Sequence, residues 1–190
     1  MIFDVEADGL LDEATKIHCM SFSTGGNPIG STSDYNTMRN ILLNQKVLIG
    51  HNIIRYDIPL LEKILGINIK AKLYDTLPMS WVINTERPLG MHGLEAFGEE
   101  FGVPKPEITD WVNLSQEEYQ HRCQEDVKIT KRLWENLIQR FMMVYKDKDN
   151  LDRFLQYLSF KMKCAYAAEE SGWKLDVDLA KDCVDKLKSA

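Results

Sequence analysis

The chain has 190 residues and a formal net charge of −6, with 44% hydrophobic and 27% charged residues. These proportions are ordinary for a soluble globular protein with a full core. No apolar run approaches the roughly 20 residues that a membrane span requires, which argues against a membrane protein. The negative net charge argues against strong electrostatic binding of duplex DNA.

The chain begins with an alternating apolar run, residues 1–6, that predicts a buried strand. Asp4 and Glu6 are two positions apart, so they point to the same side of this strand. Two carboxylates on one face repel each other unless a cation lies between them, and their hard oxygens favour Mg²⁺ or Mn²⁺. Taken alone, the pair also fits a solvated strand end.

The following segments predict an α/β protein. Further strands are expected near residues 16–23, 28–33, 46–51 and 70–74, and helices near 34–44, 56–65 and 75–84. Three strands in close succession, followed by strands that alternate with helices, indicate a mixed sheet flanked by helices.

A second acidic motif follows the strand expected at residues 46–51. His51 and Asn52 stand at its carboxyl end, where open α/β sheets bind ligands. Tyr56 and Asp57 then begin a helix. Asp57 in its first turn either stabilises the helix dipole or joins the site formed by the first strand.

The third motif is on a long helix. Ser115 and Glu118 form a capping box that starts a helical pattern reaching about Phe141. Asp126 lies beside the apolar stripe of this helix, a poor place for an unpaired charge. A metal ion or a buried arginine would explain it.

Together the three motifs resemble the DEDD superfamily of 3′→5′ exonucleases, and in particular the amino-terminal proofreading domain of phage A-family DNA polymerases. The resemblance covers roughly residues 1–145. It implies a ribonuclease-H-like (DnaQ-like) fold and hydrolysis of single-stranded DNA from its 3′ end. A nuclease that trims RNA or DNA ends on its own is the alternative, and a catalytically silent docking module is a third.

The resemblance also implies roles for individual residues. Asp4 would bridge two divalent cations, Mg²⁺ or Mn²⁺, while Glu6 and Asp126 complete the site of the ion that activates the nucleophile. Asp57 would act through the second ion. Substrate-binding positions are implied for Leu10, Asn52 and Tyr56, for which a core leucine, a turn residue and a core aromatic are the alternatives.

The sequence does not identify the general base. The phage polymerases that the chain resembles usually have Tyr four residues before the last Asp, where this chain has Arg122. His121 has the spacing of the histidine branch of the superfamily. Positions five apart on a continuous helix differ by about 140°. His121 therefore reaches the metals only if the helix bends or begins after it. Otherwise Arg122 faces the site, as a phosphate contact, or metal hydroxide acts without a protein base.

Residues 146–190 read as a helical extension. A polar break at 146–150 precedes helices expected at 151–170 and 177–187. This segment resembles the start of the polymerase portion of the phage enzymes, and we expect 190 residues to leave no room for the polymerase domain itself. A polymerase domain or subunit is the implied partner, through residues 150–190. An apolar patch is expected at Leu158, Phe160, Met162 and Trp173.

The remaining signals are weaker. Four scattered cysteines without a Cys-x-x-Cys pair are expected to be reduced, which fits the cytoplasm, of the host if a phage encodes the chain. Arg55, Lys72 and Lys105 are either phosphate contacts or plain surface charges.

Overall fold

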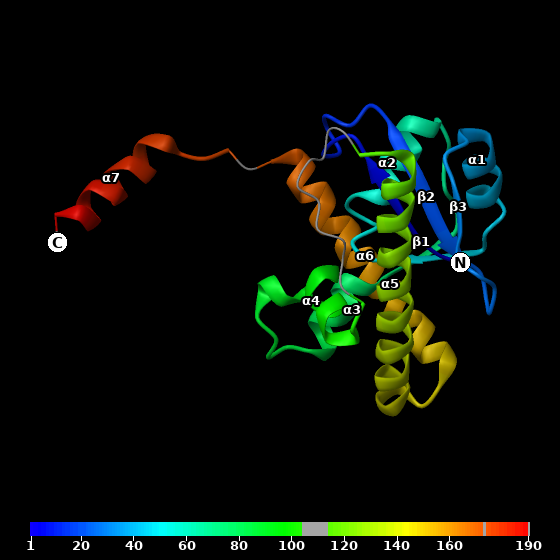
Figure 1. Ribbon diagram of the computed structural model, residues 1–190. Helices are drawn as coiled ribbons and strands as arrows, with labels where there is room; N and C mark the ends of the chain where they lie inside the picture. Colours follow the sequence, from blue (N-terminus) through cyan, green and yellow to red (C-terminus); the bar gives the residue numbers. More distant parts are fainter. Residues whose placement is uncertain (104–113, 173, 190) are drawn as a thin grey trace.

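The computed structural model of the chain (Figure 1) describes residues 1–103, 114–172 and 174–189. The strands are β1 (Ile2–Ala7), β2 (Ile17–Ser23), β3 (Gly30–Thr32), β4 (Val47–Gly50) and β5 (Lys72–Asp75). The helices are α1 (Tyr35–Leu43), α2 (Asp57–Leu65), α3 (Thr76–Ile83), the short 3₁₀ helix η1 (Leu89–His92), α4 (Leu94–Phe101), α5 (Gln116–Tyr145), α6 (Lys148–Ser171) and α7 (Val177–Lys188).

The sheet is mixed, as the sequence predicts, with strand order β3-β2-β1-β4-β5. The central strand β1 pairs antiparallel with β2 and parallel with β4, and β4 pairs parallel with β5. This mixed sheet with flanking helices confirms the ribonuclease-H-like fold.

The alternation of β1 divides the core into two layers. Phe3 and Val5 pack on one face with side chains of α1 and α2, whereas Ile2 packs on the other with side chains of α5. Asp4 and Glu6 have the same parity as Ile2, so they share the α5 face. Figure 1 shows α5 lying across this face of β1 and β2. The register of β1 therefore places the side chains of Asp4 and Glu6 on the face of the sheet that α5 covers.

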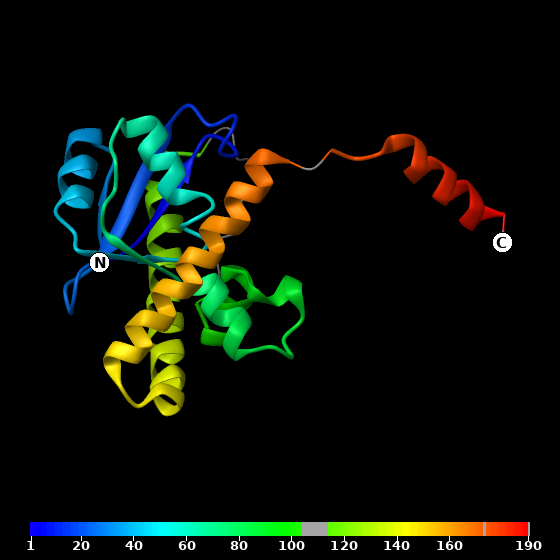
Figure 2. The ribbon, with the colours of Figure 1, turned by 180° about the vertical axis from the view of Figure 1, so that it is seen from behind.

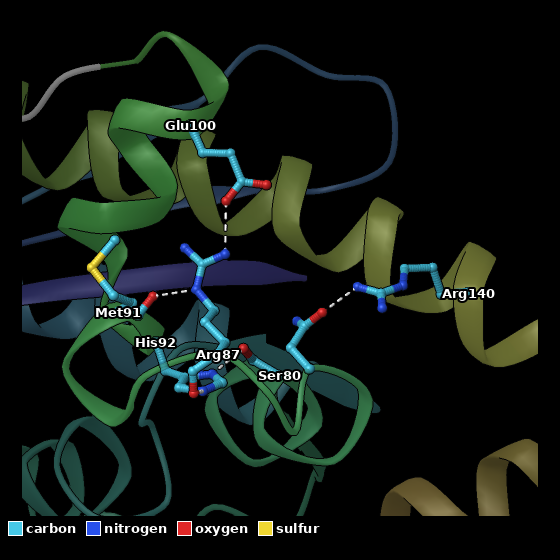
Figure 3. A network of polar contacts seen from close by, with 7 residues as sticks. Ser80, Arg87, Met91, His92, Glu100 and Arg140 are labelled. Carbon is cyan, nitrogen blue, oxygen red and sulfur yellow. Dashed lines mark hydrogen bonds and ion pairs between the residues drawn. The ribbon is translucent and has the colours of Figure 1, made fainter.

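The segment between α3 and α5 contains two elements that the sequence patterns do not predict, η1 and α4. Polar contacts hold them in place (Figure 3): Ser80 bonds the buried His92, and Arg87 donates to the backbone oxygen of Met91 and pairs with Glu100. The Arg87 guanidinium also lies 4.2 Å from the ring centre of Phe97 on α4. These contacts fix the start of α4, where Leu94 reaches the candidate site described below.

Helix α6 begins at Lys148 rather than Leu151, after a turn in which Lys146 adopts a positive φ of 53°. Figure 2 shows α6 crossing the back of the molecule, where it contacts β5, α3 and α5. Its apolar residues Leu151, Leu155, Leu158 and Met162 are buried in the two core clusters.

The packing of α6 corrects one expectation from the sequence. Leu158 and Met162 are 7% and 5% exposed, so they belong to the core and not to an exposed apolar patch. Phe160 is exposed, and Trp173 lies outside the described residues, as does Lys105. The apolar stripe that suggested a partner surface covers the sheet edge instead. The boundary at residue 145 stays a prediction, and α6 shares the core of the preceding residues.

Two further observations concern the length of the helices and the state of the cysteines. Within the parts that the structure describes, no helix combines the length and the apolar character that crossing a bilayer requires. All four cysteines are free thiols: Cys19 and Cys123 are buried, and Cys164 and Cys183 are exposed.

Candidate active site

Three carboxylates from distant parts of the chain meet beside β1. Asp4 and Glu6 on β1 and Asp126 on α5 each offer an oxygen, and these oxygens lie within 4.8 Å of one another. Asp126 is 5% exposed, and the other two are half-buried. Oxygen donors in this number and spacing fit a divalent cation such as Mg²⁺ or Mn²⁺.

Asp57 joins the same hollow, which has a volume of about 240 Å³ and which we call the carboxylate hollow. Its lining residues are Asp4, Val5, Glu6, His51, Asn52, Tyr56, Asp57, Leu94, Arg122 and Asp126. Burial raises the pKa of Asp57, and the negative charges of Asp75 and Glu6 raise it further. Backbone N–H groups of Asp57 and Val5 oppose this rise. A bound cation would favour the ionised form, so the electrostatics of this hollow also fit a metal.

Arg122 faces the carboxylates, as a continuous helix predicts. Its Nε lies 3.0 Å from Oε1 of Glu6, and both side chains are largely buried. Arg122 precedes Asp126 by four residues, so both project from one face of α5. Helix α5 thus places a guanidinium beside Glu6 and a carboxylate in the acidic cluster.

His121 does not reach this cluster, which corrects its assignment as a general base. Helix α5 runs unbroken from Gln116, with the capping box of Ser115 and Glu118 in place, so the bend that His121 requires is absent. Its side chain is 63% exposed, and Nδ1 lies 3.9 Å from a carboxylate oxygen of Glu125. The helical rotation between positions 121 and 126 carries the imidazole to the surface.

A different histidine lines the carboxylate hollow. Nδ1 of His51 lies 2.9 Å from Oγ1 of Thr76, and this hydroxyl donates to the backbone oxygen of Gly50. Because the hydroxyl proton is used on Gly50, Nδ1 of His51 is assigned as the donor to Thr76. The signal in the sequence was its position at the carboxyl end of β4, which did not by itself distinguish His51 from a loop residue.

The loop between β4 and α2 is held by Asp75, the N-cap of α3. Its carboxylate accepts hydrogen bonds from the backbone N–H groups of Asn52, Ile54 and Leu77 at 2.8, 3.2 and 3.0 Å. Burial raises the pKa of Asp75 to about 6, and the three N–H groups oppose that rise. Asp75 thereby fixes the backbone that carries Asn52 and Asp57.

Asn52 is a turn residue that also borders the site. Its φ is 61°, a left-handed conformation that asparagine tolerates better than most residues. Its side-chain oxygen is buried and accepts no hydrogen bond within the described residues. An acceptor without a donor at the edge of the carboxylate hollow fits a bound ligand that supplies one.

Tyr56 connects the hollow to the loop after β1. Its hydroxyl donates to the backbone oxygen of Gly9 at 2.7 Å. Burial raises the pKa of Tyr56 to about 12, with Asp57 and Glu6 adding to the rise, so the hydroxyl keeps its proton at neutral pH. The neighbouring Leu10 is 75% exposed, which excludes a core leucine.

Leu10 and Tyr56 also line a second hollow, of about 580 Å³, which we call the aromatic hollow. Its other lining residues are Val5, Glu6, Ala7, Asp8, Gly9, His18 and Tyr119. The rings of His18 and Tyr119 stack with their centres 3.9 Å apart. A flat apolar wall beside Glu6 is a suitable surface for a nucleobase.

The sequence and the fold of this chain are similar to those of known proteins. No family model matches the chain. The DNA-directed DNA polymerase of Escherichia phage T7 is 25% identical over 186 residues, and that of Enterobacteria phage T3 is 24% identical. Each match covers 73% of this chain and 26% of the polymerase, so the chain spans about a quarter of the length of these relatives.

Solved structures of nucleases are similar to this chain in fold. NrnC of Brucella melitensis with bound Mg²⁺ superposes with a TM-score of 0.62 and 21% identity, over 87% of this chain and 86% of NrnC. NrnC bound to pGG gives a TM-score of 0.61 and 20% identity, over 83% and 81%. With the phage matches, these likenesses confirm the resemblance to DEDD-type 3′→5′ exonucleases that the motifs indicated.

Proposed function

We propose that the chain is a metal-dependent exonuclease that removes nucleotides from the 3′ end of single-stranded DNA. The observation that carries this proposal is the meeting of Asp4, Glu6 and Asp126 within 4.8 Å, with Asp57 in the same hollow. Four acidic groups from three chain segments have little structural value together, because their charges repel one another without a cation.

The residues divide the work of hydrolysis between them. Asp4, Glu6 and Asp126 would hold one Mg²⁺ or Mn²⁺, and Asp57 with Asp4 would hold a second. When bound, such a pair of ions activates water and stabilises the charge of the leaving oxygen. A water oxygen bonds to phosphorus as the bond to the 3′ oxygen of the preceding nucleotide breaks. The products are a nucleoside 5′-monophosphate and a strand with a new 3′-hydroxyl.

The other lining residues would orient the strand. The exposed Leu10 and the half-buried ring of His18, which stacks on the buried Tyr119, would contact bases, and the Tyr56 hydroxyl fixes the Gly9–Leu10 turn. Arg122 keeps Glu6 in place and brings a positive charge toward the reacting phosphate. No protein base is assigned, because His121 lies on the surface.

The likeness to phage DNA polymerases supports proofreading for a polymerase as the biological role, with residues 150–190 as the connection to that partner, inside the host cytoplasm. The second candidate is the trimming of short RNA or DNA strands. It is favoured by the likeness to NrnC bound to pGG.

The decisive experiment follows degradation of 5′-labelled single-stranded DNA and matched RNA, with Mg²⁺, Mn²⁺ or EDTA. We expect a ladder that shortens from the 3′ end, that EDTA abolishes and that Asp4→Ala lacks. Asp182→Ala, on the exposed helix α7, is the control. The ratio of the DNA and RNA rates distinguishes proofreading from RNA trimming. If neither DNA nor RNA is cleaved with Mg²⁺ or with Mn²⁺, the result contradicts the proposal and favours a docking module.

A further inference from the structure

Arg55 and Glu169 are joined by a two-pronged ion pair. Arg55 lies in the loop between β4 and α2, two residues before Asp57, and Glu169 lies in the last turn of α6. Nε of Arg55 is 3.0 Å from Oε2, and Nη2 is 2.6 and 2.7 Å from the two carboxylate oxygens. The same forked geometry is the one with which arginine binds a phosphate group.

This ion pair borders a third hollow, of about 300 Å³, which we call the α6 hollow. Its lining residues are Leu10, Leu11, Asp12, Asn52, Arg55, Tyr56, Tyr166, Glu169 and Glu170. Asn52 and Tyr56 also line the carboxylate hollow, and Leu10 also lines the aromatic hollow. A strand whose end lies at the carboxylates and continues toward α6 therefore passes Arg55.

Stability explains the ion pair poorly. Glu169 and Glu170 stand at the C-terminal end of α6, where the helix dipole disfavours negative charge, and the last turn contains no basic residue. The side chains of Arg55 and Glu169 are 35% and 53% exposed, so water screens their attraction. Two acidic residues at the wrong end of a helix, facing a predicted substrate path, fit a functional role better.

We propose that Arg55 binds a phosphate of the nucleic-acid strand and that Glu169 is an intramolecular competitor for this arginine. The inference rests on the proposed exonuclease function. A phosphodiester presents two oxygens to the fork of Arg55, as the Glu169 carboxylate does. The strand must therefore displace Glu169 to reach Arg55. The end of α6 thus acts as an autoinhibitory contact on strands that are long enough to enter the α6 hollow.

The test is the binding of a labelled DNA dinucleotide and decanucleotide, with Ca²⁺ replacing Mg²⁺ under conditions in which neither strand is cleaved. Glu169→Gln releases Arg55, so we expect it to tighten decanucleotide binding by about two- to fivefold. In the wild type Glu169 holds Arg55 in part of the complexes, so the slope of log K against log salt should steepen in the variant by up to about 0.7, the value for one phosphate contact on a single strand. Dinucleotide binding should not change.

The matched control is Glu170→Gln, which removes the same charge from the same hollow. Glu170 makes no hydrogen bond or ion pair with Arg55 in the described part of the chain, so its loss should leave the salt slope unchanged. In an Arg55→Gln background, Glu169→Gln should have no effect, because its partner is gone. Thermal unfolding of each variant checks that the fold is intact.

The outcomes are decisive. Equal gains from Glu169→Gln and Glu170→Gln, or a gain that persists without Arg55, would overturn the competition. If the wild-type chain cleaves DNA but Glu169→Gln does not change decanucleotide binding, this inference is overturned and the exonuclease function is retained. A wild-type chain that neither binds nor cleaves any strand overturns the proposed function, and this inference with it.

Discussion

Nε of Arg122 lies 3.0 Å from Oε1 of Glu6, which places a guanidinium beside a proposed metal ligand. The arginine occupies the position where the resemblance to phage polymerase exonucleases implies a tyrosine. It partly neutralises the carboxylate cluster before any metal binds, and it orients Glu6 through a contact that a tyrosine hydroxyl would not reproduce. A divalent cation bound at this cluster would therefore share the charge of Glu6 with Arg122.

The first prediction concerns Arg122→Gln. Removing the guanidinium leaves Glu6 with more negative charge, so we expect Mn²⁺ to bind more tightly, by about two- to tenfold, while the cleavage rate falls. Titration calorimetry with Mn²⁺, alongside single-turnover cleavage, checks both. Weaker Mn²⁺ binding would show that Arg122 acts mainly by positioning Glu6.

The second prediction concerns Asp126→Asn. This change keeps the shape of the side chain but removes a buried metal ligand, so we expect cleavage to fall by about 10³-fold or more. In EDTA the variant should unfold at the same urea concentration as wild type or a higher one, because a repelling charge is gone. Retained cleavage would contradict the assignment of Asp126 as a ligand.

The third prediction concerns His121→Ala. Because the imidazole is exposed and lies away from the carboxylates, we expect kcat/KM to change by less than about threefold, far below the roughly 10²–10⁴ of a general base. Matched cleavage assays of the two proteins at neutral pH provide the measurement. A loss of a hundredfold would restore His121 as the base and require α5 to bend during catalysis.

The fourth prediction concerns the hydroxyl of Tyr56. Tyr56→Phe removes the hydrogen bond to the Gly9 oxygen, and we expect a loss of about 0.5–1.5 kcal/mol in the free energy of unfolding. KM for single-stranded DNA should rise more than kcat falls, because the Gly9–Leu10 turn loses its anchor. Tyr35→Phe, which removes a hydroxyl that bonds the backbone N–H and oxygen of Ile17 on β2, is the control.

The fifth prediction concerns pH. The pKa values of Asp57 and Asp75 are raised above the usual 3.8, to about 6 for Asp75. At a pH between the usual carboxyl pKa and the raised pKa of the folded state, the folded chain binds more protons than the unfolded chain. The free energy of unfolding therefore falls as pH rises through this range. In EDTA we therefore expect the urea midpoint to decrease between pH 5 and pH 8, roughly the range that brackets these shifts. Asp57→Asn should reduce the dependence. Saturating Mg²⁺ should do the same.

Much of the fold could be predicted from local patterns in the sequence. The alternation of β1, the apolar run of β4 and the capping box at Ser115 each act over a few residues, and each element formed where expected. Helix α4 was missed because it is short and contains Gly98, which helix propensity disfavours. That glycine is needed there: a Cβ on it would lie 2.6 Å from the backbone oxygen of Val103.

The sequence by itself determined the carboxylates of the candidate site, because their motifs report which chemistry each segment carries. Only the tertiary structure decided which neighbours they have. The choice between His121 and Arg122 depended on the rotation of an unbroken helix about its axis, and Leu158 was assigned to the core once α6 packed on the sheet edge. The pairing of Arg55 with Glu169 joins residues 114 positions apart, and such contacts arise from how elements pack, which no local pattern encodes.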